Sequence, residues 1–199
     1  IGLDEGRIKE LCQAALLHDI GKSKVPKDIL NKKGKLTEDE FNIVKKHTID
    51  GYILSKRLSF LSEEVRQAIL SHHEREDGSG YPRGIRGKKI NLYAKIIAIA
   101  DVYDALTSKR VYKNKRSPFD AIEEFYYMGI HKFSRSILEI FLKNISQLYV
   151  NSKARLNDGM LGKIQFIHPK YITKPVIQIE EKNINLLKYN FLKIEEITG

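Results

Sequence analysis

Hydrophobic residues recur with helical spacing along most of the chain and change to short alternating runs after about residue 149. The 3.6-residue period of a helix marks residues 4–20, 37–58, 62–73, 92–107, 118–129 and 134–148. Beyond them, turn signals separate four or five short runs that are typical of strands. The pattern predicts a mainly α protein, with a helical domain at residues 1–148 followed by a small all-β module at residues 149–199.

Two of the predicted helices matter most for the candidate chemistry. The first is expected to end at Gly21, and its apolar stripe consists of Ile8, Leu11, Cys12, Ala15 and Leu16. The second begins with a capping box of Thr37 and Glu40 and is expected to run unbroken to about Leu58. Its predicted core face consists of Phe41, Val44, Gly51, Leu54 and Leu58, and Gly51 there indicates close approach of a neighbour.

Polar side chains interrupt these buried stripes at positions where partners are required. His72 and His73 follow Ile69 by three and four residues, so both lie toward the core face of their helix. His47 lies on the core face of residues 37–58 in the same way. These histidines could bind a metal or be hydrogen-bonded core residues, because buried polar groups need partners of some kind.

Two aspartates raise the same question more sharply, because a buried carboxylate needs a cation. Asp19 points inward near a helix C-terminus, where the helix dipole also disfavours it, so either Lys22 or a metal must balance it. Asp101 interrupts a helix that is apolar nearly all round. The loop Gly80-Tyr81-Pro82 then reads as a rigid turn that presents an aromatic ring just after the two histidines.

Composition narrows the setting in which this site would work. The 199 residues carry a net charge of +10, concentrated at residues 109–116 and 83–89, and such clusters favour anionic partners. A single cysteine, Cys12, excludes an internal disulfide and fits a reducing, cytoplasmic compartment. No apolar run reaches the ~18 residues of a membrane span, and no signal peptide is recognised. The start at Ile1 suggests a fragment of a longer protein.

The inward polar residues offer six nitrogen and oxygen ligands and no thiolate: His18, Asp19, His47, His72, His73 and Asp101. This number exceeds what one tetrahedral zinc ion takes. It suits two ions of the manganese or iron type with a bridging carboxylate. Two metals ~3.5–4 Å apart are a common device for in-line attack at phosphorus.

Three motifs in order resemble the HD-GYP subfamily of the HD phosphohydrolases. His18-Asp19-Ile20-Gly21-Lys22 is similar to the HD motif itself. His72 to Pro82 and Asp101-Val102-Tyr103-Asp104-Ala105 are similar to the motifs that distinguish the subfamily. The resemblance covers roughly Gly2 to Leu148 and implies an HD-type helical bundle that hydrolyses the bacterial second messenger cyclic di-GMP.

The resemblance also implies roles for single residues. It makes His18, Asp19, His47, His72, His73 and Asp101 the ligands of two or three iron or manganese ions, with Asp19 as the bridge. Lys22 would assist at the scissile phosphate or the attacking water, and Tyr81 would border the substrate. Arg110 and Lys113 would contact its phosphates, and Val111 between them replaces a common proline.

One departure concerns the segment before the HD motif. The family usually supplies a further histidine there, and in some members a glutamate, from a preceding helix. Only seventeen residues precede His18, and none is histidine, so we expect that helix, and a sensory domain before it, to belong to the parent protein.

The leading hypothesis is therefore a metal-dependent cyclic di-GMP phosphodiesterase that produces linear pGpG, GMP or both. A hydrolase of another cyclic dinucleotide, such as cyclic GMP-AMP, and a catalytically silent cyclic di-GMP receptor are the alternatives. Nucleic-acid binding has no recognised motif to support it, and we expect no membrane contact from these residues.

Overall fold

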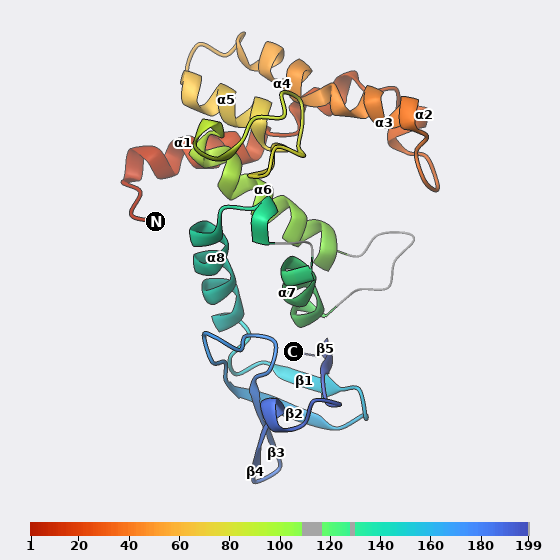
Figure 1. Ribbon diagram of the computed structural model, residues 1–199, viewed down its shortest axis with the longest axis vertical. Helices are drawn as coiled ribbons and strands as arrows, with labels where there is room; N and C mark the ends of the chain where they lie inside the picture. Colours follow the sequence, from red (N-terminus) through yellow and green to blue (C-terminus); the bar gives the residue numbers. More distant parts are fainter. Residues whose placement is uncertain (109–116, 128–129, 199) are drawn as a thin grey trace. The chain divides into compact units, whose positions relative to one another are not determined.

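A computed structural model describes residues 1–108, 117–127 and 130–198 (Figure 1). The chain forms two compact units. The first unit comprises Ile1–Ile99 with His131–Ser134, and the second comprises Ala100–Ile130 with Arg135–Gly199. Within the described ranges, no helix combines the length and the hydrophobicity needed to cross a bilayer.

The first unit is helical, and three of its helices begin with the caps at which the sequence predicts a helix start. Asp4, Thr37 and Ser62 each accept a hydrogen bond from a backbone N–H of the following first turn, and Thr37 completes a capping box with Glu40. The elements are α1 (Glu5–Leu17), η1 (Ile20–Lys24), α2 (Lys27–Leu30), α3 (Glu38–Lys45), α4 (His47–Ser55), α5 (Glu63–Ser71), η2 (Gly87–Lys89) and the first half of α6 (Leu92–Thr107).

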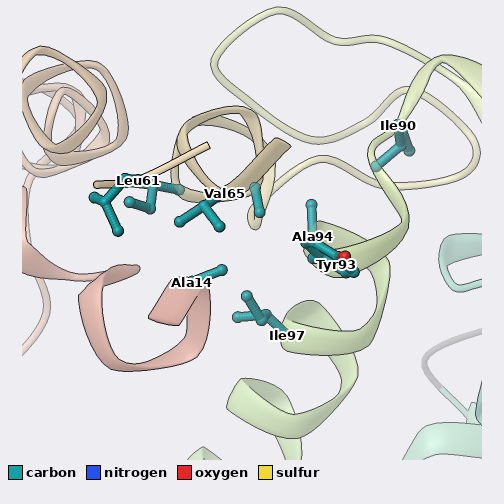
Figure 2. Close-up of a cluster of buried hydrophobic side chains, with 9 residues drawn as sticks. Ala14, Leu61, Val65, Ile90, Tyr93, Ala94 and Ile97 are labelled. Atoms are coloured by element: carbon teal, nitrogen blue, oxygen red, sulfur yellow. The ribbon is translucent and has the colours of Figure 1, made fainter. Parts of the chain in front are cut away.

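The core of the first unit lies where side chains of α1, α5 and α6 converge (Figure 2). Its buried members are Ala14, Leu61, Val65, Ala68, Ile69, Ile90, Tyr93, Ala94 and Ile97. The predicted stripe of α1 was wrong at four of its five positions, since Ile8, Cys12, Ala15 and Leu16 are exposed. Leu11 faces the core as predicted, but together with Ala14 and Leu17, because the weakly amphipathic sequence of α1 allows more than one apolar stripe.

Two glycines let η1 and α4 touch through their backbones. A Cβ atom on Gly21 would lie 1.9 Å from the carbonyl oxygen of His47 and 2.5 Å from the backbone nitrogen of Gly51. Gly51 in turn faces Gly21 and Ile69, so the close approach that its position predicted is confirmed. We expected Gly21 to end the first helix, but α1 ends earlier, at Leu17. Gly21 instead lies buried within η1, where it makes this contact possible.

The expected continuous helix over residues 37–58 was also wrong, because the helix is interrupted at Lys46. The backbone N–H of Lys46 bonds to the carbonyl of Ile43, which tightens the turn to a 3₁₀ form before α4 begins. The imidazole of His47 bonds to the carbonyl of Val44 at the same place. A side chain that takes a backbone acceptor in this way is invisible to hydrophobic periodicity.

The second unit contains the remaining helices and a five-stranded antiparallel sheet. Its helices are the second half of α6, α7 (Pro118–Tyr127) and α8 (Arg135–Gln147). Between α7 and α8 in the sequence comes η3 (Ile130–Lys132), whose last two residues belong to the first unit. The strands β1 (Lys153–Leu156), β2 (Leu161–Phe166), β3 (Val176–Ile179), β4 (Lys182–Asn185) and β5 (Ile194–Ile197) have the order β4-β3-β2-β1-β5, with η4 (Leu186–Lys188) following β4. The expected β module is therefore present.

The Asn157-Asp158-Gly159 turn joins β1 to β2, as its sequence predicted, and places Ala154 opposite Gly162. Ile164 pairs with Ile177 on the neighbouring strand, and both are fully buried. Helix α8 ends at Gln147, and Leu148, which the sequence pattern includes in this helix, lies exposed after it. The exact domain boundary at residues 148/149 stays a prediction.

Candidate metal centre

Three of the predicted ligands lie where a helix ends or begins. His18 is the C-cap of α1, His72 is the C-cap of α5, and His47 starts α4 directly after the interruption. Each imidazole Nδ1 donates to the backbone carbonyl three residues earlier, at 2.7, 2.7 and 2.8 Å for His18, His47 and His72. Carbonyls at helix ends lack helical partners, so each of these bonds satisfies a backbone acceptor and at the same time fixes the orientation of one imidazole ring.

These bonds determine which nitrogen faces the centre. A carbonyl oxygen only accepts, so Nδ1 carries a hydrogen in each ring, and the neutral imidazoles of His47 and His72 keep the lone pair on Nε2. The Nε2 atoms of His47 and His72 lie 3.3 Å apart, and Asp19 Oδ1 lies 3.4 and 3.8 Å from them. Asp19 Oδ1 is buried without a hydrogen-bond partner among the described residues. Three converging acceptors are electrostatically unfavourable unless a cation joins them.

His73 completes a group that we call the Asp19 cluster: Asp19, His47, His72 and His73. One ligand atom from each residue lies within 4.8 Å of all the others. The ring of His73 lies 4.1 Å from that of His72 and stacks on Tyr81 at 4.7 Å, centroid to centroid. His18 lies beside the cluster, with Nε2 3.3 Å from Asp19 Oδ2 and its ring 5.0 Å from that of His72.

The electrostatics of the cluster keep every member in its metal-binding protonation state. Burial lowers the pKa of His72 to about 3 and that of His73 to about 2, and it also lowers the pKa of His47. Burial raises the pKa of Asp19, but hydrogen bonds from His18 and Lys22 outweigh it and hold that pKa below its usual value. Neutral imidazoles and an ionised carboxylate are the forms that bind metal.

The simpler partner that the sequence offered for Asp19 is present as well. Lys22 Nζ donates to Asp19 Oδ2 at 2.5 Å. This ion pair uses only one carboxylate oxygen, because Oδ1 points toward the imidazoles of His47 and His72. The lysine pairing therefore does not replace a cation at Oδ1.

The structure says different amounts about the other predicted site residues. Asp101 is half-buried on α6, in the part of that helix that belongs to the second unit, and its role as a ligand stays a prediction. Arg110 and Lys113 lie outside the described residues. Tyr81 does lie beside the cluster, through its stack on His73.

A buried carboxylate that we did not single out from the sequence organises the loop bearing Tyr81. Glu74 is 2% exposed, and its two carboxylate oxygens accept from the backbone N–H groups of Arg83 and Ile85 at 2.8 and 3.1 Å. The backbone N–H of Tyr81 donates to the carbonyl of His73 at 3.2 Å. The position of Glu74, directly after two inward histidines, was the available signal.

The residues of the Asp19 cluster fit a divalent cation. Three imidazole nitrogens and one carboxylate oxygen form a donor set that suits zinc, iron or manganese. The buried and otherwise unbonded Oδ1 of Asp19 supplies the structural reason to place the ion there. The arrangement can therefore hold a cation next to the Lys22 ammonium and the Tyr81 ring.

Comparisons with known proteins identify the family to which the chain is related. The HD domain family matches residues 2–137. The chain is 37% identical over 177 residues to a cyclic di-GMP phosphodiesterase of Pseudomonas aeruginosa, which covers 89% of this chain and 42% of that protein. It is also 37% identical over 151 residues to a 3′3′-cGAMP-specific phosphodiesterase of Vibrio cholerae, which covers 75% of this chain and 35% of that protein. The chain thus spans about two fifths of the length of these relatives.

A solved structure of an HDG"Y"P protein from Bdellovibrio bacteriovorus shares the fold. The likeness has a TM-score of 0.55 at 22% identity and covers 70% of this chain and 45% of that one. The family match over residues 2–137 covers the motifs on which the resemblance rests, and the solved structure shows the same kind of fold. The chain belongs to the HD domain family, in agreement with its resemblance to HD-GYP proteins.

Proposed function

We propose that the protein is a metal-dependent phosphodiesterase that hydrolyses cyclic di-GMP to linear pGpG, GMP or both. The observation that carries this proposal is the buried Asp19 Oδ1, which meets two imidazole acceptors and has no hydrogen-bond partner among the described residues. The similarity to a protein named as a cyclic di-GMP phosphodiesterase, over 89% of this chain, supports the substrate class.

The proposed metal ligands are His18, Asp19, His47, His72, His73 and Asp101. The Asp19 cluster has enough donors for one ion, and His18 and Asp101 would extend the set to two, or three with ligands from elsewhere in the protein. Iron and manganese suit this set of nitrogen and oxygen ligands. Such ions, when bound, would activate a water and neutralise charge at the phosphorus.

The protein's own side chains would position the substrate and balance its charge. Lys22 has its ammonium at Asp19, where it can donate to a phosphate oxygen and offset the charge that develops there. Tyr81 is held against His73 and would border the dinucleotide. Arg110 and Lys113 are proposed to contact its phosphates, and a compact dianion suits a chain with net charge +10.

A second candidate substrate is 3′3′-cyclic GMP-AMP, because the relative named as specific for it is as similar to this chain, at 37% identity, as the cyclic di-GMP enzyme is. A silent cyclic di-GMP receptor remains the non-enzymatic alternative. We further infer a cytoplasmic location and an upstream sensory domain, and the greater length of both relatives leaves room for such a domain.

The deciding experiment measures hydrolysis by the full-length protein, purified without oxygen and supplied with Mn²⁺ or Fe²⁺. Cyclic di-GMP and cyclic GMP-AMP are compared, products are separated by chromatography, and bound metal is counted. The variant Asp19→Ala removes the proposed bridging ligand, and Asp28→Ala removes an exposed carboxylate of α2 as the matched control.

We expect metal-dependent turnover of cyclic di-GMP that is lost in Asp19→Ala and retained in Asp28→Ala. Faster turnover of cyclic GMP-AMP would favour the second substrate. Turnover in Asp19→Ala equal to that of the wild type would contradict the metal mechanism. Tight binding of cyclic di-GMP without turnover, in protein of confirmed metal content, would support the receptor.

A further inference from the structure

A short row of rings leads away from the Asp19 cluster toward solvent. His73 stacks on Tyr81 at 4.7 Å with 28° between the ring planes. Tyr81 meets Phe41 of α3 edge to face, with 6.3 Å between centroids and 82° between planes. Phe41 is 43% exposed, although the sequence pattern places it on a core face. The outer end of the row is therefore an open aromatic surface beside the proposed reaction centre.

A cation covers the same place. Lys45, one helical turn after Phe41, has its Nζ 4.6 Å from the Phe41 ring centroid and 6.0 Å from that of Tyr81. The ammonium also donates to Asn42 Oδ1 at 3.1 Å. Among the described residues, no carboxylate lies within ion-pair distance of it. The charge is thus held at the rings without being neutralised.

Single exposed aromatic residues are ordinary, and so are solvated lysines, so neither side chain alone implies a ligand. The combination differs because both converge on Tyr81, which itself contacts the cluster through His73. A cyclic dinucleotide presents flat purine rings close to anionic phosphates. An aromatic face next to a cation matches both groups at once.

We propose that Phe41 and Lys45 form, with Tyr81, one wall of the substrate site, in which Phe41 stacks on a guanine base and Lys45 pairs with a phosphate. This inference rests on the proposed function, and it assigns substrate-binding roles to two residues of α3. The Lys45 side chain is long enough to move from the ring to the ligand, so the base takes the place over Phe41 that the ammonium holds in the free protein.

The test compares kcat and KM for cyclic di-GMP in the metal-loaded, full-length protein. Phe41→Leu keeps an apolar side chain but removes the aromatic face, and Lys45→Gln removes the charge. Phe60→Leu is the matched control for the ring, because Phe60 is also exposed in the first unit. Lys56→Gln is the matched control for the charge, because Lys56 lies 4.6 Å over Tyr52 with the same helical spacing.

We expect KM to rise about tenfold in Phe41→Leu, with kcat within about twofold of wild type, since loss of one base stack weakens binding by roughly that factor. Lys45→Gln should raise KM by about threefold and reduce its dependence on salt, because an exposed charge pair is screened. Metal content and melting temperature should match the wild type in both. Neither control variant should move KM.

If the wild type is active and KM is unchanged in both Phe41→Leu and Lys45→Gln, the proposed substrate-binding roles of Phe41 and Lys45 are wrong. The phosphodiesterase proposal is then unaffected. If the metal-loaded wild type does not turn over cyclic di-GMP, the proposed activity fails instead. Direct titration with labelled cyclic di-GMP then decides the wall: weaker binding in Phe41→Leu supports it, and equal binding, or no binding by the wild type, overturns it.

Discussion

The Asp19 cluster and the five-stranded sheet use main-chain polar groups in different ways. At the cluster, helix-end carbonyls accept from the imidazoles of His18, His47 and His72 and thereby hold functional side chains in place. In the sheet, strand pairing occupies the backbone groups, and side chains such as Ile164 and Ile177 fill the core between them. The comparison teaches that substitutions near the cluster should alter chemistry, whereas substitutions in the sheet should alter stability alone.

Gly21→Ala should have the largest effect and should not follow this division, because it affects both stability and the metal site. The new Cβ would lie 1.9 Å from the carbonyl oxygen of His47, and a backbone atom cannot move aside as a side chain can. We expect unfolding to become easier by about 4 kcal/mol or more, with loss of metal binding. Urea denaturation and metal analysis measure both effects. Ser23→Ala, at an exposed position of η1, should change stability by at most about 0.5 kcal/mol.

Ile164→Ala tests the sheet. Removing this fully buried side chain of β2 should cost about 2–5 kcal/mol in the free energy of unfolding. Metal content and kcat below the unfolding transition should stay at wild-type values. Leu161→Ala, at an exposed position of the same strand, provides the control. Loss of metal from the folded Ile164→Ala protein would show that the two regions are not separable.

Glu74→Gln sharpens the comparison within the first unit, because Glu74 supports the loop of Tyr81 without belonging to the cluster. The amide retains one acceptor, so one of the two backbone N–H groups, of Arg83 or Ile85, loses its partner. We expect stability to fall by about 1–3 kcal/mol and kcat/KM by about tenfold, with metal still bound. Steady-state kinetics of the variant should be compared with those of Glu64→Gln, which alters an exposed carboxylate. Equal kcat/KM values in the two variants would show that Glu74 does not support the site.

Acid should destabilise the metal-free protein through the histidines, gradually over several pH units rather than in one step. The pKa of His72 falls to about 3 and that of His73 to about 2 on folding, from an ordinary value of 6.5. Below pH 6.5 the unfolded chain therefore binds more protons, and stability decreases toward pH 3, by at most about 1.4 kcal/mol per histidine and pH unit. Thermal unfolding between pH 7 and 5 checks this. The double variant His72→Gln, His73→Gln should show a shallower slope.

Sequence patterns predicted those parts of the molecule that local physics determines. The helix α6 has the expected bounds, because an apolar run that long has one stable arrangement, and Asn91 caps it by accepting from the backbone N–H of Ala94. The β1–β2 turn follows from Asn157-Asp158-Gly159 in the same way. The motifs also predict Asp19, His47, His72 and His73 as ligands, and the structure brings these four side chains together.

Features that depend on single side-chain-to-backbone bonds, or on contacts distant in sequence, could not be predicted in this way. The interruption at Lys46 involves a side chain bonded to a backbone carbonyl, and the exposure of Phe41 depends on where Tyr81 lies. Periodicity identifies an apolar stripe but does not say which neighbour covers it, and this explains the error over α1. Glu74 was missed because its partners are backbone groups nine and eleven residues away.

The three bonds from imidazole Nδ1 to backbone carbonyls have a consequence for evolution and engineering. In many proteins the outer partner of a metal-binding histidine is a carboxylate, which a point mutation can remove. Here the partner is the main chain at Ala15, Val44 and Ile69, and every amino acid supplies a carbonyl. At these three positions the side chain is limited by packing alone, strictly at the buried Ile69 and little at the exposed Ala15, while the helix ends supply ring orientation and tautomer. Sequence drift around the site is thus buffered, and a designer could transfer the orientation by copying backbone geometry alone.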